Sequence, residues 1–159
     1  MSVVINSGIW QALRIIINHL KEENIRWTIM GTVSLALQGI DVTPDDIDIL
    51  TDEDGAFRIG SILEEYEVKP IRFGRTDLFE SFYGIYHIGE TKVEVMGNLR
   101  IRLADMWTSL SDRLKSPIII RQNSLDIPVS SLHDQLLFYE KLGRAKDKET
   151  IPKIREVLK

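Results

Sequence analysis

The sequence predicts an α+β fold, in which a mixed sheet is flanked by helices and followed by a helical C-terminal part. Two observations indicate this class. Over the first 130 residues, segments with the apolar period of a strand are mixed with segments that have the period of a helix. From Ser131 onward only the helical period remains. We therefore expect an α+β core over residues 1–130 and a helical segment over residues 131–159 that packs on it.

Composition and charge limit the classes of function. With 159 residues, of which 43% are apolar and 28% charged, the chain can bury a core and is typical of globular proteins. Its formal net charge of −4 gives no overall attraction to nucleic acid or acidic membranes. The absence of cysteine excludes disulfides, thiolate metal sites and a cysteine nucleophile. No signal peptide or membrane span is recognisable, so we expect a cytoplasmic protein with no membrane partner.

Capping residues and apolar spacing define the expected elements. Asn6 or Ser7 can cap a first helix, which the spacing of apolar residues extends to about Asn24. Asp52 can cap a helix that runs to about Tyr66, with Phe57 turned inward. Further helices are expected over residues 32–38, 131–142 and 151–158. Strands are expected over residues 26–30, 46–51, 68–73, 82–88, 92–96, 118–120 and 125–129.

An acidic strand, DDIDIL at residues 45–50, is the most informative segment. Residues two apart in a strand point to the same side, so Asp46 and Asp48 share one face while Ile47 and Ile49 take the other. The two carboxylates would then be ~7 Å apart along the strand. The pattern fits either a functional site or a solvated edge strand whose acids prevent aggregation.

A second strand repeats the arrangement. In Val93-Glu94-Val95 the acid points away from its two valines, and Glu94 joins the aspartates if the two strands are neighbours. Three carboxylates in one place repel each other unless one is protonated or a cation lies between them. Magnesium prefers oxygen ligands and keeps positions open for phosphates. The acids could therefore hold a divalent metal for phosphoryl transfer, although Glu94 by itself could also be an ordinary surface residue.

The segment WTIMGTVSLALQGIDVTPDDIDILTD resembles the signature of the nucleotidyltransferase superfamily, which has the DNA polymerase β-like fold. In that family a strand ends at a glycine and a small residue, a short helix follows, and a strand with two acids comes next. Gly31-Thr32 matches the glycine step, Asp46 and Asp48 match the acid pair, and Glu94 matches the third acid. The later GRAKDKETI is similar to the helical end of small stand-alone bacterial and archaeal members, including antibiotic nucleotidyltransferases.

The resemblance implies a catalytic set and its ligands. Asp46, Asp48 and Glu94 would hold Mg²⁺ or Mn²⁺, and Gly31 and Thr32 would bind the phosphates of a nucleoside triphosphate. Gly31 also lacks the Cβ that would keep a phosphate away from the backbone. The sequence departs from the family in its looser Thr32 and in Asp41, where relatives often carry a basic residue.

Cations for a triphosphate must come from local segments. Arg72 precedes a loop that could fold over the cleft, and Lys141 and Arg144 belong to the helical segment that reaches the triphosphate in family members. We therefore assign these three residues to nucleotide binding. His19, His87 and His133 are too scattered to predict a zinc site or a histidine base. Trp107, with Met106 and Leu110, is interpreted as a packing patch.

Two functions fit this pattern. The first is an enzyme that moves a nucleoside monophosphate from an NTP to an acceptor hydroxyl, releasing pyrophosphate, with Glu94 as a metal ligand or direct base. The acceptor could be a small molecule, a protein or an RNA end. The second is a catalytically inactive or antitoxin-like binding protein that kept the fold, a reading that Asp41 and Thr32 favour. A homodimer is compatible with either function.

Overall fold

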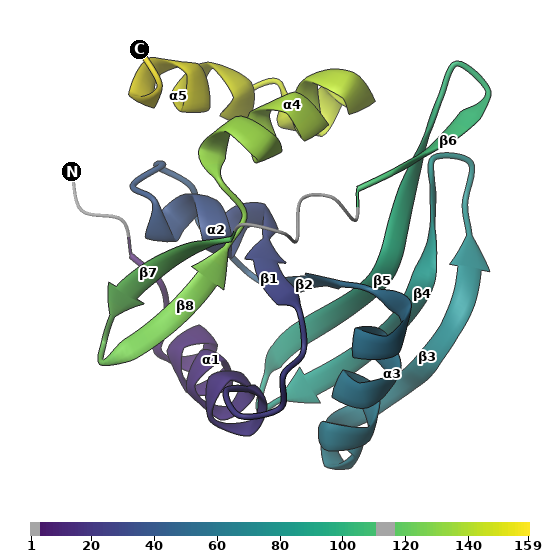
Figure 1. Cartoon of the computed structure of the whole chain (residues 1–159). Coiled ribbons are helices and arrows are strands. Elements are labelled where there is room, and N and C mark those ends of the chain that lie inside the picture. The colour runs from purple at the N-terminus through teal and green to yellow at the C-terminus, as the bar shows by residue number, and fades with distance from the viewer. Residues whose placement is uncertain (1–3, 111–116) are drawn as a thin grey trace.

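The computed structural model describes residues 4–110 and 117–159, which form one mixed sheet covered by helices (Figure 1). The strands are β1 (Trp27–Met30), β2 (Ile47–Thr51), β3 (Glu67–Arg75), β4 (Phe79–Ile88), β5 (Thr91–Leu103), β6 (Met106–Ser109), β7 (Ile118–Gln122) and β8 (Leu125–Val129). The helices are α1 (Ser7–Leu20), α2 (Gly31–Leu37), α3 (Glu53–Ile62), α4 (Leu132–Leu142) and α5 (Thr150–Val157). The α+β class is thus confirmed.

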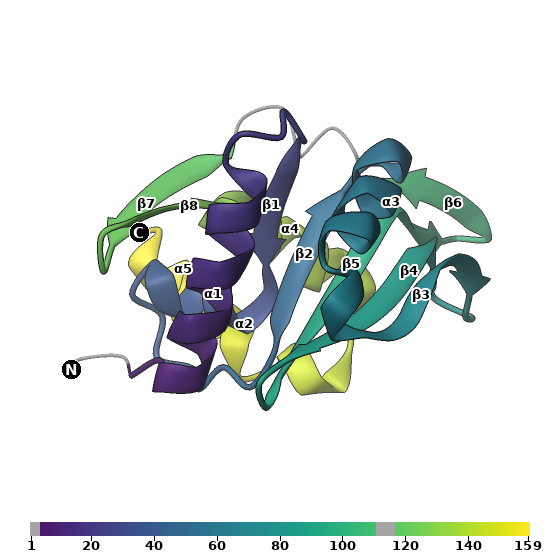
Figure 2. The ribbon, with the colours of Figure 1, turned by 90° about the horizontal axis from the view of Figure 1, so that it is seen from below.

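The sheet has eight strands in the order β3-β4-β5-β2-β1-β8-β7, with β6 paired to β5. β2 runs parallel to β5 and antiparallel to β1, so the acidic strand lies in the middle of the sheet. Helices α1 and α3 cover one face, and α2, α4 and α5 lie on the other side (Figure 2). Because β2 is paired on both edges, its acids do not belong to the solvated edge strand that the sequence also allowed.

Strand β2 divides its side chains between two apolar clusters. Ile47 and Ile49 pack with Val93 and Val95 of β5 in the cluster that includes α1 and α3. Each of these isoleucines contributes roughly 2–3 kcal/mol through burial of its side chain. Asp48 alternates with them and therefore points to the other face of the sheet, as its spacing predicted.

The second cluster joins the C-terminal helices to that other face. Phe138 and Tyr139 of α4 and Ile154 of α5 pack with Met30 and Leu50 of the central strands. Helix α4 ends at Gly143, whose φ of 62° is the left-handed conformation that stops a helix. The helical segment therefore covers the face that carries Asp48.

Helix α3 begins where it was expected, but Phe57 does not point inward. Asp52 caps it by accepting a hydrogen bond from the backbone N–H of Gly55 at 2.7 Å. Phe57, expected to point inward, is 46% exposed, and its ring lies beside that of Phe82. The helix ends at Ile62. It turns Ala56 and Ile59 toward the sheet, so Phe57 lies at the edge of the interface between the helix and the sheet.

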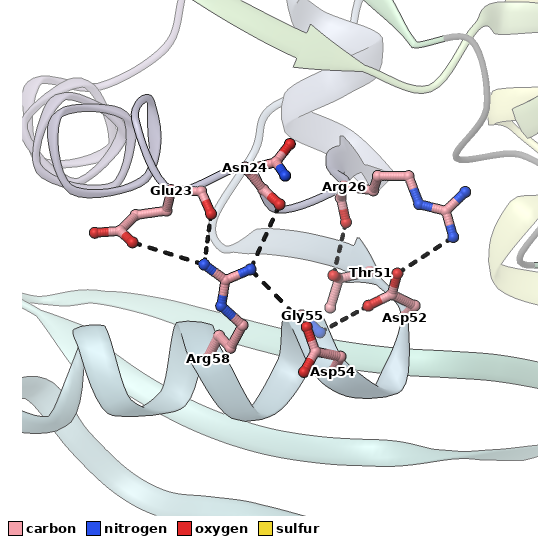
Figure 3. A network of polar contacts seen from close by, with 8 residues as sticks. All are labelled: Glu23, Asn24, Arg26, Thr51, Asp52, Asp54, Gly55 and Arg58. Atoms are coloured by element: carbon pink, nitrogen blue, oxygen red, sulfur yellow. Dashed lines mark hydrogen bonds and ion pairs between the residues drawn. The ribbon is translucent and has the colours of Figure 1, made fainter.

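A polar network fixes the end of β2 that is remote from the acids (Figure 3). Arg58 of α3 donates hydrogen bonds to the backbone carbonyls of Glu23 and Asn24, in the connection between α1 and β1. At the last residue of β2, the Thr51 hydroxyl donates to the Arg26 carbonyl at 2.7 Å. Helix α1 ends at Leu20, and residues 21–26 form this connection. The expected extension of the helix to Asn24 was therefore wrong.

Strand β5 is longer than the expected residues 92–96, and it forms with β6 a hairpin that was not predicted. Strand β5 continues to Leu103 and returns as β6 through Ala104 and Asp105, which have φ values of 49° and 64°. Such paired left-handed residues are typical of tight hairpins, although alanine is an unusual residue there. Of the predicted packing patch, Met106 is 70% exposed on β6, whereas Leu110 is buried in the second cluster.

Candidate active site

A cavity of about 850 Å³ lies between the β2 and β5 face of the sheet and the C-terminal segment. This volume is in the range of small-molecule binding sites. Among the described residues that line it, six are acids: Asp45, Asp46, Asp48, Glu80, Glu94 and Asp147. Three are cations: Arg75, Arg144 and Lys146. Because acids outnumber cations, a triphosphate would need additional positive charge to enter.

Asp48 and Glu94 meet because their strands are neighbours. In the parallel pairing of β2 and β5, Asp48 stands directly opposite Glu94, and the two carboxyl groups are hydrogen-bonded. Asp46 precedes β2 by one residue and lines the same cavity. The structure therefore brings together the three acids that the sequence analysis selected. Asp45 also lines the cavity, although its place in the strand period predicted the opposite side.

Burial and neighbouring charge make Asp48 unusual. Burial raises the pKa of Asp48 to about 7, and the negative charges of Glu94 and Asp46 add to the effect. The charge of Lys146 acts in the opposite direction. At neutral pH, Asp48 can therefore hold a proton that it shares with Glu94, unless a cation favours the charged form.

Two further side chains contact Glu94. The Lys92 Nζ lies 2.8 Å from Glu94 Oε1 and 3.9 Å from Asp46 Oδ2. The hydrogen bond to Glu94 is the main reason that the pKa of Lys92 is raised. Tyr83 of β4 also shares a hydrogen bond with Glu94, and burial together with that negative charge raises the pKa of its hydroxyl. The sequence analysis gave neither residue a role, because neither belongs to the family motif.

The glycine step touches the acids directly. Gly31 has a φ of 75°, and a Cβ at this position would overlap Oδ2 of Asp48. The contact arises because β1 and β2 are antiparallel, with Met30 opposite Asp48. Gln135 of α4 donates a hydrogen bond to the Gly31 carbonyl at 3.4 Å, which connects the step to the C-terminal segment. Thr32, at the cavity rim, is exposed.

The cations are arranged differently from the expectation. Arg144 lines the cavity, but its guanidinium is paired with Asp147, with Nε 2.8 Å from Oδ2, and lies against the rings of Phe79, Phe138 and Tyr139. Lys146, which the sequence analysis missed, lines the cavity with its charge acting on Asp48.

Arg72 and Lys141 lie elsewhere. Arg72 is exposed on edge strand β3 and is not among the described residues that line the cavity. Lys141 lines a smaller cavity of about 220 Å³. The structure therefore does not bring these two residues to the acids.

Comparison with known families agrees with this geometry. The model of the aminoglycoside-2''-adenylyltransferase family matches residues 12–154. The chain belongs to this family. A candidate nucleotidyltransferase from Thermotoga maritima is 39% identical, with a TM-score of 0.85 over 95% of this chain and 94% of that chain. Comparison with curated proteins gave no match.

Two antibiotic adenylyltransferases share the fold at lower identity. The enzyme ANT(2'')-Ia, in complex with adenylyl-2''-tobramycin, is 13% identical with a TM-score of 0.58, over 96% of this chain and 91% of that chain. The lincosamide adenylyltransferase LnuA, bound to lincomycin, is 15% identical with a TM-score of 0.57, over 98% of both chains. The resemblance to nucleotidyltransferases is thereby confirmed.

Members of a nucleotidyltransferase family generally use a divalent metal, and the donor set here suits one. The carboxyl groups of Asp48 and Glu94 are neighbours, and the raised pKa of Asp48 reflects a charge conflict that Mg²⁺ would relieve. Across residues 4–110 and 117–159, however, no group of three or more acids or histidines is already arranged to hold an ion. The carboxylates thus fit the metal chemically, while the Lys92 ammonium is positioned between Asp46 and Glu94.

Among the helices within residues 4–110 and 117–159, none is long and apolar enough to cross a membrane.

Proposed function

We propose that the protein transfers a nucleoside monophosphate from an NTP to the hydroxyl of a small-molecule acceptor and releases pyrophosphate. The observation that carries this proposal is the pairing of Asp48 with Glu94 directly beneath the glycine step. The family supports an adenylyl donor, so ATP is the first nucleotide to test. A protein or RNA acceptor is less well supported, because the related structures hold antibiotic-sized molecules.

Each residue has a separate task in this reaction. Glu94 accepts the proton of the acceptor hydroxyl, the acceptor oxygen bonds to the α-phosphorus, and the bond from that phosphorus to the pyrophosphate oxygen breaks. Gly31 and Thr32 allow the phosphates to lie close to the backbone. Lys146 supplies positive charge from the C-terminal segment, a task for which Arg144 is less suited because Asp147 neutralises it.

A divalent ion, Mg²⁺ or Mn²⁺, held by Asp46, Asp48 and Glu94 would neutralise phosphate charge and favour attack at phosphorus. Asp48 would lose its proton when such an ion binds, because the positive charge favours the carboxylate. Tyr83 restricts the orientation of Glu94 through their hydrogen bond.

The first prediction tests this function through Asp48→Asn, which keeps the shape of the side chain but removes its charge. Purified protein is incubated with each α-labelled NTP, Mg²⁺ and an acceptor panel that includes tobramycin and lincomycin. We expect labelled acceptor with the unaltered protein and a loss of at least about 100-fold with Asp48→Asn, since the loss of one charged group at the phosphates removes several kcal/mol of stabilisation.

The matched control is Asp126→Asn, an exposed aspartate on β8 that is not among the described residues of the cavity. It should retain full activity. Equal activity of Asp48→Asn and the unaltered protein would contradict the mechanism. If the unaltered protein neither binds Mg²⁺·NTP at millimolar concentration nor transfers label, the inactive binding protein becomes the better reading.

A further inference from the structure

Lys92 occupies the place between two of the three proposed metal ligands. It lies on β5 two residues before Glu94, so both side chains point to the same face of the sheet. Its ammonium is hydrogen-bonded to Glu94 and is also within ion-pair distance of Asp46. The Lys92 side chain is 41% exposed, so it has an open path to solvent if these contacts are lost.

We propose that Lys92 is an internal counter-ion that holds Asp46 and Glu94 in the metal-free protein and is displaced when a divalent cation binds. This inference rests on the proposed function, because it takes these carboxylates as metal ligands. Two observations favour it. The acids are close enough to share one ammonium, yet no preformed set of three ligands is found in the described residues. An ammonium and a divalent ion cannot both occupy the space between two carboxylates.

Displacement has a consequence for affinity. A metal ion must break the contacts of Lys92 before it gains Asp46 and Glu94, so the apparent affinity is the intrinsic affinity multiplied by the fraction of protein in which Lys92 has left the acids. In return, the ammonium placed beside Asp46 and Glu94 lowers the mutual repulsion of these two acids while the metal is absent. Lys92 is therefore a positioning residue and a regulator of metal loading, and no chemical step is assigned to it.

The first test measures the chemical reactivity of Lys92 with Mn²⁺ alone, without nucleotide. The intact protein is pulse-labelled with an amine-acetylating reagent in the presence of EDTA or Mn²⁺, and each lysine is quantified by mass spectrometry. An ammonium held between Asp46 and Glu94 reacts slowly, because these contacts restrict its access to the reagent. We expect Mn²⁺ to increase the labelling of Lys92 several-fold and to leave the exposed Lys69 unchanged.

The second test compares Lys92→Met with the matched control Lys69→Met by calorimetric titration of Mn²⁺. Methionine retains the length of the side chain but cannot pair with carboxylates. We expect Lys92→Met to bind Mn²⁺ about tenfold more tightly than the unaltered protein, since the competing cation is gone. Lys69→Met should match the unaltered protein. Urea unfolding of each variant in Mn²⁺ establishes that the folded state is compared.

The outcomes separate this inference from the proposed function. Mn²⁺ binding that leaves the labelling of Lys92 unchanged, or that is equal or weaker in Lys92→Met, overturns the role of Lys92 alone. Absence of Mn²⁺ binding to the unaltered protein overturns the displacement of Lys92 by metal, while the proposed function still stands or falls with Mg²⁺·NTP, because Mg²⁺ can enter together with the phosphates. If labelling changes only when NTP is added with the metal, Lys92 responds to phosphate instead, and the displacement by metal is refuted.

Discussion

A single glycine sets how closely β1 approaches the acids. Gly31 combines a left-handed backbone with a contact that leaves no room for a Cβ beside Asp48. Gly39 has a comparable φ of 89° but no atom within 4 Å of its Cβ position. The two glycines thus separate the effect of backbone conformation from the effect of crowding.

We predict that Gly31→Ala lowers the free energy of unfolding more than Gly39→Ala. Both variants force alanine into a left-handed conformation, which costs about 1 kcal/mol. Gly31→Ala must also displace the Asp48 carboxylate, which adds about 1–3 kcal/mol of overpacking. Urea unfolding in EDTA measures the difference. Equal losses in the two variants would show that Asp48 moves aside without penalty.

The proton on Asp48 should make stability depend on pH. Its pKa is raised from 3.8 to about 7 in the folded protein, so between these values the folded state holds a proton that the unfolded chain has released. The contribution of Asp48 therefore lowers the free energy of unfolding as pH rises from about 4 to about 7. Above that range the penalty for the charged form is fully present.

We predict that Asp48→Asn gains stability over the unaltered protein as the pH rises. In metal-free buffer the two should be nearly equal at pH about 4.5, while at pH about 8 the variant should be more stable by about 1–2 kcal/mol. The full shift would correspond to about 4 kcal/mol, which relaxation around the charged group reduces. Urea unfolding across this range gives the curve, with exposed Asp45→Asn as the control for loss of one charge. A difference that stays constant with pH would contradict the raised pKa.

At the scale of elements, strand periodicity predicted which acidic side chains share one face of the sheet. Asp46 and Asp48 alternate with Ile47, and Glu94 alternates with its valines, so their common face followed from local sequence. That β2 and β5 are neighbours came from the family resemblance, since no local pattern specifies which strands pair. The sequence therefore indicated three acids but could not indicate Lys92 or Tyr83, whose contacts depend on that pairing.

Of the three cations chosen from the sequence, only Arg144 lines the cavity, for a related reason. Helical spacing does not show which acids an arginine or lysine will meet, so the pairing of Arg144 with Asp147 and the location of Lys141 at a smaller cavity could not be predicted. Asp147 is buried, and its pairing with Arg144 connects the end of α4 to the 3-10 helix Ala145–Asp147. This pair therefore stabilises the wall of the cavity.

We predict that Asp147→Ala destabilises the protein by about 1–3 kcal/mol, because it leaves the half-buried guanidinium of Arg144 without its carboxylate. The control is Glu140→Ala, which removes the partner of Arg155 in an exposed ion pair and should change stability by less than about 1 kcal/mol. Thermal and urea unfolding measure both. If the two losses are the same, Arg144 does not depend on Asp147 and becomes available to bind phosphate.

At the scale of the whole molecule, the site is a consequence of two cores on opposite faces of one sheet. The core with α1 and α3 holds β2 and β5 together, and the core with α4 and α5 closes the cavity over the acids. A boundary between two parts at residue 130 remains a prediction, as does a homodimer. The helices after this residue share a cluster with the central strands, so we expect the cavity to be lost if they are removed.

The place of β1 in the sheet has a consequence during synthesis of the chain. One edge of β1 pairs with β2 soon after it in the sequence, but the other edge pairs with β8, about a hundred residues later. Until the ribosome has released that distant strand, the open hydrogen-bonding edge of β1 can recruit strands from other nascent chains. Chaperones that shield emerging polypeptides would therefore matter from the emergence of β1 until β8 has followed it.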